Sequence, residues 1–304
     1  MDVRRLELLR ELAERGSVGA VAQATHRTPS AVSQQLKVLE RESGVPLTER
    51  SGRGIKLTDA GRALARTATD IAVAMERAEA LWSEYKGTPS GEVTLATFPT
   101  AGQMFLPGLM TRIDEHPSIR LVAHDHDPTL EGFAQLVGDY DIVLAHSSEG
   151  PKSWRGRGLK SLDLMTEPLD IALPPGHRLT EKTRVTPADL AGETWIGVPL
   201  DFPFQQVLSE IEEITGEQPQ VKQRFADIRI IEALVQAGHG VAILPRYTAG
   251  ASRADVVVRP LSGIHPVRHI SALMRPDRAE RPSVQLILEA LAAEAKDYVE
   301  GRHA

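Results

Sequence analysis

The sequence predicts an α/β protein with an N-terminal, all-α-type winged helix-turn-helix domain. Residues 17–40 have the pattern of two short helices joined by a tight turn, and a basic hairpin follows at residues 48–58. From about residue 92 to residue 298, short apolar strand patterns alternate with helical patterns. Such alternation is typical of parallel α/β sheets with helices on both faces. With 304 residues, the chain is long enough for two or three domains.

The second of the two short helices is expected to read DNA. Thr28 suits the N-cap and Pro29 the first helical position, because proline lacks the N–H that would be unpaired there. At about 100° per residue, Val32, Leu36 and Leu39 share one face of the helix. The opposite face carries the hydroxyl, amide and ammonium groups that suit a major groove, on Ser30, Ser33, Gln34 and Lys37.

The hairpin that follows is expected to form a basic wing. Ser51, Gly52 and Gly54 favour a tight turn between two short strands. Arg50 and Arg53 lie on or beside its tip, where they can reach phosphates or the minor groove. A recognition helix followed by a basic hairpin is typical of a winged helix-turn-helix.

Charge and composition agree with this interpretation. The whole chain has a net charge of −6, yet residues 1–66 hold 12 basic and 8 acidic side chains. Positive charge is therefore concentrated where DNA would bind. The chain has no cysteine, which excludes disulfides, thiolate metal sites and a cysteine redox switch. No signal peptide or run of roughly 18 apolar residues is present, so we expect a cytoplasmic protein with no membrane partner.

A long helix is predicted over residues 58–86, with residues 87–91 as a hinge. Proline is absent from 58–86, and apolar side chains recur at alternating spacings of four and three. This pattern favours a coiled coil with a second chain, although a helix packed on its own domain has the same pattern. The side chains of this seam are Leu64, Ala68, Ile71, Met75, Ala78, Trp82 and Tyr85.

Residues 1–61 resemble the DNA-binding domain of the LysR-type transcriptional regulators. The matching pieces follow in order: Ala20-x-Ala22, Ser30-Ala-x-Ser33-x-Gln35-Leu36, Leu39-Glu40, Gly44-Val-x-Leu47, Arg50, Leu57-Thr58 and Gly61. Further along, Gly238-His-Gly-Val-Ala-Ile-Leu-Pro245 resembles a second signature of that family. Thr28 and Gln34 depart from the usual family pattern where bases would be read, so the operator sequence does not follow from the resemblance.

The resemblance implies a regulator that senses a small metabolite and changes its binding or bending of promoter DNA. Residues 92–304 would form an effector-binding domain with two α/β subdomains, arranged like a periplasmic binding protein. Subdomain I would span about 92–165 and 269–304, and subdomain II about 166–268. The implied partners are double-stranded DNA, a second chain paired through the linker helix, a homotetramer, a small-molecule effector and RNA polymerase. No cofactor or metal is expected.

The effector is expected in the cleft between the two subdomains. Open α/β sheets bind ligands beyond the C-terminal ends of their strands, where helix N-termini present N–H groups. Similar family members often bind carboxylates or amino acids there. If Asp201 points into the cleft, its carboxylate favours an effector that bears an amine. The expected contacts are Thr97, Phe98, Thr100, Ala101, His146, Asp201, Phe202, Phe204, Asp227 and Ile228.

Two other classes of protein remain as alternatives. In a metal-dependent enzyme, His124 and His126 would share one strand face and His146 would add a third nitrogen ligand for zinc or iron. The sequence lacks the common nucleophile, zinc-protease, dinucleotide and phosphate-loop motifs. A solute-binding module would share the architecture of the C-terminal part, and the winged helix argues against it.

Overall fold

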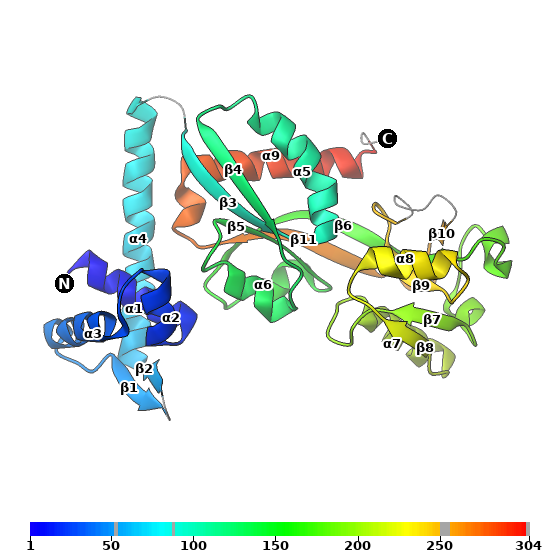
Figure 1. Cartoon of the computed structure of the whole chain (residues 1–304), viewed down its shortest axis with the longest axis horizontal. Helices are drawn as coiled ribbons and strands as arrows, with labels where there is room; N and C mark the ends of the chain where they lie inside the picture. Colours follow the sequence, from blue (N-terminus) through cyan, green and yellow to red (C-terminus); the bar gives the residue numbers. More distant parts are fainter. Residues whose placement is uncertain (52–53, 87–88, 250–255, 302–304) are drawn as a thin grey trace.

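The computed structural model of the chain describes residues 1–51, 54–86, 89–249 and 256–301 (Figure 1). A small helical domain surrounds the lower end of a long helix, and two α/β subdomains follow it side by side (Figure 1). Within the described residues, no helix combines the length and the apolar character needed to cross a membrane.

The N-terminal domain is a three-helix unit with a two-stranded hairpin. Each helix begins at a side chain that accepts a backbone N–H: Asp2 from Arg4, Ser17 from Ala20 and Thr28 from Ala31. Fully buried leucine and valine side chains hold the three helices together. The elements are α1 (Val3–Arg15), α2 (Val18–Ala24), α3 (Pro29–Ser43), β1 (Thr48–Ser51) and β2 (Gly54–Leu57).

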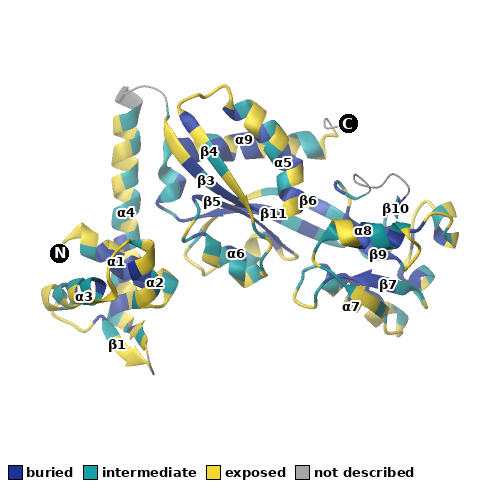
Figure 2. Ribbon diagram, viewed as in Figure 1, coloured by how far each residue is buried: buried dark blue, intermediate teal, exposed yellow. Residues whose placement is uncertain are grey.

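The long helix α4 (Asp59–Lys86) has two parts with different surroundings. Ala68 is buried in the core of the N-terminal domain, and Ile71 packs against that core. Farther along, Met75 and Trp82 are 47% and 61% exposed (Figure 2). Leu64, Ala68 and Ile71 of the seam therefore pack within the chain, whereas Met75, Ala78 and Trp82 are exposed.

Subdomain I is built on three parallel strands. β3 pairs with β4 on one side and with β5 on the other, both in parallel. Its helices bury a core around Phe105 and Leu144, each 0% exposed. The elements are β3 (Gly91–Thr97), α5 (Pro99–Ile113), β4 (Ile119–Asp125), α6 (Leu130–Leu136), β5 (Ile142–Ser147), η1 (Gly150–Trp154), η4 (Arg278–Glu280) and α9 (Pro282–Val299).

Subdomain II has a second core centred on Trp195, which is 1% exposed. Strands β7 and β8 pair in parallel, and β9 and β10 both pair with the long strand β6. The elements are β6 (Lys160–Leu173), η2 (Arg178–Glu181), η3 (Pro187–Leu190), β7 (Thr194–Gly197), α7 (Gln205–Thr215), β8 (Gln220–Arg224), α8 (Ile228–Gln236), β9 (Ala242–Pro245) and β10 (Val257–Arg259).

Two long strands join the subdomains. The chain enters subdomain II on β6 and returns on β11 (Val267–Met274), so these strands lie antiparallel over residues 160–168 and 267–274. β11 is also antiparallel to β5. The predicted parallel pairing is found for β3 with β4 and β5 and for β7 with β8, and it does not extend to the crossing strands, because a chain that leaves and returns must run in opposite directions. Sequence reasoning also missed β10 and the exposed first half of β6.

Candidate DNA interface and effector cleft

Helix α3 presents its polar side chains to solvent. Ser30, Gln34 and Lys37 are exposed and Ser33 is half-buried. On the opposite face, Val32, Leu36 and Leu39 are at most 4% exposed and belong to the domain core. Thr28 and Pro29 are exposed at the start of the helix. This arrangement leaves one polar face free to enter a groove.

The wing is tied to the recognition helix by Glu40. Its Oε1 accepts hydrogen bonds from the backbone N–H of Leu47, the backbone N–H of Thr48 and the Thr48 hydroxyl, each at 2.9 Å. The carboxylate therefore fixes where the hairpin leaves the domain. Sequence reasoning did not single out this role, although Glu40 belongs to the ordered family pattern. Arg50 is exposed on β1, and Arg53 lies outside the described residues.

A cavity of about 130 Å³ lies between the two α/β subdomains. Three of the predicted effector residues, His146, Asp201 and Phe202, line it. Sequence reasoning missed the other lining residues, because turns far apart in the chain supply them. Those residues are Asp127, Pro128, Thr129, Leu130, Phe133, Pro199, Pro203 and Ala226.

His146 is at the centre of an aromatic cluster. Its side chain is 2% exposed, and its ring centroid lies 4.6 Å from that of Phe98 and 5.3 Å from those of Phe133 and Phe202. Nε2 lies 3.6 Å from Oδ1 of Asp127. Nδ1 is buried and has no hydrogen-bond partner among the described residues. Burial lowers the pKa of His146 below its usual value, so the ring is neutral at pH 7.

We expect His146 to make the folded protein sensitive to mild acid. Burial lowers the pKa of His146 in the folded protein below the ordinary value of 6.5. As the pH falls below 6.5, the histidine therefore takes up a proton in the unfolded chain more readily than in the folded protein. The free energy of unfolding should therefore fall with pH in that range. Thermal unfolding between about pH 7.5 and 5.5 should show a larger loss of Tm for the wild type than for His146→Phe. Equal losses would contradict the prediction.

A buried ion pair stands beside the cleft. Arg268 on β11 donates from Nε to Oε2 of Glu167 on β6 at 2.7 Å, and the residues are 2% and 0% exposed. The guanidinium lies 5.2 Å from the ring centroid of Phe98 and 5.7 Å from that of Phe204. In the sequence, the signal for this pair is a charged residue within each of the two crossing strands.

The remaining predicted effector residues do not line the cavity. Thr97, Thr100 and Ala101 are buried where β3 meets α5. Asp227 caps α8 and pairs with Arg229 at 2.9 Å. Ile228 packs against the core of subdomain II.

The three histidines of the enzyme alternative are not brought together as a metal site. Nε2 of His126 lies 2.7 Å from the hydroxyl of Tyr140, and the ring of His124 is 5.5 Å from the same tyrosine. His146 instead belongs to the aromatic cluster of the cleft. In the part of the chain that the structure describes, no group of three or more His, Cys, Asp or Glu side chains is placed to hold a metal ion.

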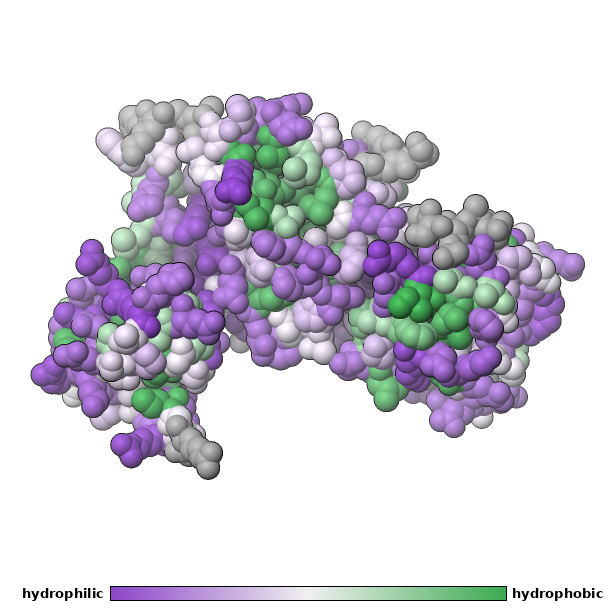
Figure 3. Space-filling view, viewed as in Figure 1, coloured by the Kyte–Doolittle hydropathy of each residue, from purple (hydrophilic) through white to green (hydrophobic). Residues whose placement is uncertain are grey.

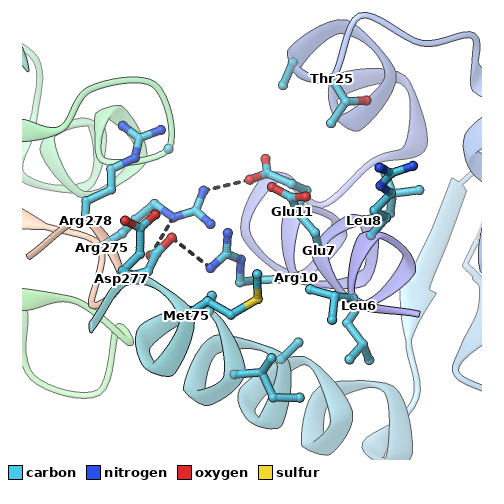
Figure 4. A pocket seen from close by; sticks show the side chains of 18 of the residues that line it. Leu6, Glu7, Leu8, Arg10, Glu11, Thr25, Met75, Arg275, Asp277 and Arg278 are labelled. Carbon is cyan, nitrogen blue, oxygen red and sulfur yellow. Dashed lines mark hydrogen bonds and ion pairs between the residues drawn. The ribbon is translucent and has the colours of Figure 1, made fainter. Parts of the chain in front are cut away.

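The N-terminal domain docks against subdomain I through buried ion pairs (Figure 4). Arg275, which follows β11, places Nη1 2.7 Å from Oε1 of Glu11 and Nε 3.3 Å from Oδ1 of Asp277. Arg10 on α1 reaches Oδ2 of Asp277 at 2.9 Å. These four residues, each between 4% and 7% exposed, form the docking cluster.

The charges of the docking cluster stabilise one another. Burial alone would raise the pKa of Asp277, but Arg275 and Arg10 outweigh it and hold that pKa below its usual value. For Glu11, burial is likewise outweighed by Arg15 and Arg275, so its pKa is also lowered. Removing Arg275 would therefore leave Glu11 with Arg15 alone and Asp277 with Arg10 alone.

Further ion pairs extend this contact on either side. Arg15 of α1 donates to Asp139 of subdomain I at 2.8 Å. Arg77 of α4 contacts Glu280 at 3.0 Å. The linker helix and α1 are therefore both held to subdomain I. Nothing in the sequence pattern had paired these segments, because their partners lie more than 100 residues away in the chain.

Comparison with known proteins identifies the two parts of the chain. Residues 3–62 match the bacterial regulatory helix-turn-helix protein, lysR family, and residues 86–296 match the LysR substrate binding domain. The chain is 28% identical over 309 residues to the transcriptional regulator CbbR of Xanthobacter flavus, covering 98% of this chain and 89% of CbbR. It is 26% identical to OxyR of Escherichia coli strain K12, covering 96% of this chain and 95% of OxyR.

Solved structures share the fold. A full-length OxyR variant from Pseudomonas aeruginosa gives a TM-score of 0.66 at 19% identity, covering 96% of this chain and 98% of that one. CbnR in complex with its target DNA gives 0.55 at 23% identity, covering 97% of this chain and all of that one. Because the two family matches together cover most of the sequence, the chain belongs to the LysR family of DNA-binding transcriptional regulators.

Proposed function

We propose that this LysR-family regulator contacts operator DNA through the polar face of α3 and the tip of the wing. The supporting observation is the separation of the two faces of α3: Gln34 and Lys37 are exposed, whereas Val32 is fully buried. Arg50 is exposed beside the tip, where phosphates would lie. Binding to chromosomal DNA would place the protein in the cytoplasm.

We infer that two chains pair through the second half of α4. Met75 and Ala78 lie on the predicted seam and are exposed, which suits burial against a second copy of the helix. Pairing would present two recognition helices to a two-fold operator. Hydrophobic residues also gather over α5 and α8 (Figure 3), including Met110 and Ile230 at 47% and 43% exposure. These surfaces are our candidates for assembly into a tetramer.

We infer that a small-molecule effector binds in the cleft and acts on the DNA-binding domain through β11. That strand carries Arg268 beside the cleft and leads directly to Arg275 in the docking cluster. Seven residues of extended chain span about 23 Å at about 3.3 Å each. A change in the angle between the subdomains would therefore move the docking surface and, with it, the recognition helices. Contact with RNA polymerase would be a further consequence of DNA binding.

Two variants test the DNA interface. Arg53→Ala should weaken binding to every DNA sequence and reduce the slope of log affinity against log salt by about one unit, because one phosphate contact is lost. Gln34→Ala should relax discrimination at a single base position by about 1–3 kcal/mol, because an amide reads a base edge. Fluorescence anisotropy with the operator and with scrambled DNA measures both. If both variants behave like the wild type, the proposed interface is wrong.

A further inference from the structure

We propose that the cleft cavity takes a small organic cation, such as a primary alkylammonium, in preference to a free carboxylate. This inference rests on the proposed function of the cleft as the effector site and adds the chemical class of the effector. It is carried by the charges, the aromatic walls and the hydrogen-bonding groups of the cavity.

The charged side chains around the cavity are acidic. Asp127 of subdomain I and Asp201 of subdomain II stand on opposite walls, and the described lining contains no lysine or arginine. The side chain of Asp127 is only 23% exposed, so water screens it incompletely. A bound ammonium would be attracted from both walls, and more strongly by Asp127, because Asp201 is exposed to solvent that screens its charge.

The guanidinium beside the cleft offers little to an anion. Nη2 of Arg268 lies 2.6 Å from Oε2 of Glu167, and both side chains are at most 2% exposed. Their charges balance within the protein. Nη2 has no hydrogen-bond partner among the described residues, but Arg268 does not line the cavity, so a carboxylate bound there would not reach it.

The apolar walls suit a cation. Phe133 and Phe202 line the cavity, and their ring centroids each lie 5.3 Å from that of His146. Aromatic faces attract ammonium groups, most strongly where water is excluded. The same rings repel the negative charge of a carboxylate, because the face of an aromatic ring is its negative region.

His146 supplies the acceptor that an ammonium group needs. A neutral imidazole has one N–H and one bare nitrogen. With its Nε2 facing the carboxylate of Asp127 at 3.6 Å, the N–H is assigned to Nε2 and the lone pair to Nδ1. Nδ1 is buried and has no partner in the described chain, so a ligand N–H would satisfy it only after the surrounding rings shift to admit the ligand. A carboxylate carries no donor for this atom.

The size of the cavity limits the ligand. A cavity of about 130 Å³ is smaller than the roughly 300–1,000 Å³ of pockets that take drug-sized ligands. An alkylammonium of about four to six heavy atoms fits this space, with its carbon chain against the phenylalanine rings and its nitrogen toward the carboxylates.

The test compares three ligands of similar size on the full-length protein: n-propylammonium, propionate and n-propanol. Isothermal titration calorimetry should show saturable binding of n-propylammonium at pH 7, and at least about tenfold weaker binding of the other two. Asp127→Asn and Asp201→Asn should each weaken propylammonium binding by about tenfold or more, because each removes an attractive charge. Glu212→Gln is the matched control, since Glu212 is exposed on α7 of the same subdomain and does not line the cavity.

The outcomes separate the ligand class from the function of the cleft. Binding of propionate or propanol as tightly as propylammonium would overturn the cation class and leave the cleft as an effector site. Propylammonium binding that both Asp variants retain would also overturn the inference, because binding would lie elsewhere. Absence of binding by all three ligands would likewise overturn it. Operator binding by the same protein samples reports separately on the proposed regulator function.

Discussion

Replacing Arg275 with methionine is expected to loosen the contact between the N-terminal domain and subdomain I without unfolding either one. Methionine keeps most of the apolar stem but leaves Glu11 and Asp277 without their shared cation. Removing one partner of a buried ion pair typically costs about 3–5 kcal/mol. Because each domain has a separate hydrophobic core, this cost falls on the contact between the domains and not on their folding.

Because the chain contains no cysteine, spin labels can be attached only at cysteines that are introduced by mutation. Spin labels are attached at Gln23→Cys on α2 and Glu289→Cys on α9, which are both exposed positions. Double electron–electron resonance then measures the distance between the two labels, and so between the two domains. Labelled protein is diluted with unlabelled protein, so that distances between two chains do not contribute. A narrow distance distribution should become broad and longer in Arg275→Met.

Arg120→Met is the matched control for this experiment. Arg120 pairs with Glu92 within subdomain I, and its side chain is 77% exposed. Exposed pairs contribute at most about 1 kcal/mol, so the distance distribution should not change. An unchanged distribution in Arg275→Met as well would show that the docking cluster does not hold the domains together.

A methyl group at Gly61 is expected to disrupt the N-terminal domain. A Cβ atom at this position would lie 2.1 Å from the carbonyl oxygen of Leu47 and 3.3 Å from Cβ of Leu57. The carbonyl cannot easily move, because it accepts the N–H of Thr58 at 3.0 Å and the next residue is held by Glu40. Overpacking of this kind costs about 1–3 kcal/mol, which in a domain of this size lowers Tm by on the order of 10 °C.

Gly61→Ala should also weaken operator binding, because the clash displaces the point where the wing begins. Gly19→Ala is the control: Gly19 lies in helix α2, and its added Cβ would meet no atom within 4 Å. Alanine is favoured over glycine in a helix, so this variant should unfold at the same or a slightly higher temperature. Differential scanning calorimetry compares the two. Similar Tm values for both variants would contradict the close packing described for Gly61.

The N-terminal domain could be predicted closely because its signals are local. Thr28 caps α3 and Pro29 begins it, as their positions beside an apolar pattern predicted. The alternation of strands and helices also predicted most strands and helices of both subdomains, but not β10 or the first half of β6. The antiparallel direction of β6 and β11 could not be read from this alternation. It follows from the path of the chain, which enters subdomain II on β6 and returns on β11.

The cleft was predictable only in part. The expectation that ligands bind beyond strand ends placed His146 and Asp201 near one another, and both line the cavity. The same expectation did not identify Asp127 and Phe133, which become neighbours of His146 only after folding. The docking cluster was not predicted at all, because Arg275 and Glu11 are 264 residues apart in the chain.

The proposal that this regulator reads specific DNA is tested most directly by selection from genomic DNA. Purified protein is incubated with fragmented genomic DNA, the retained fragments are sequenced, and the best site is titrated at increasing salt. Enrichment of an interrupted palindrome upstream of a few genes, with affinity that falls steeply with salt, is the predicted result. Retention without sequence preference, both with and without added metabolites, would contradict the proposal that this protein recognises a specific DNA sequence.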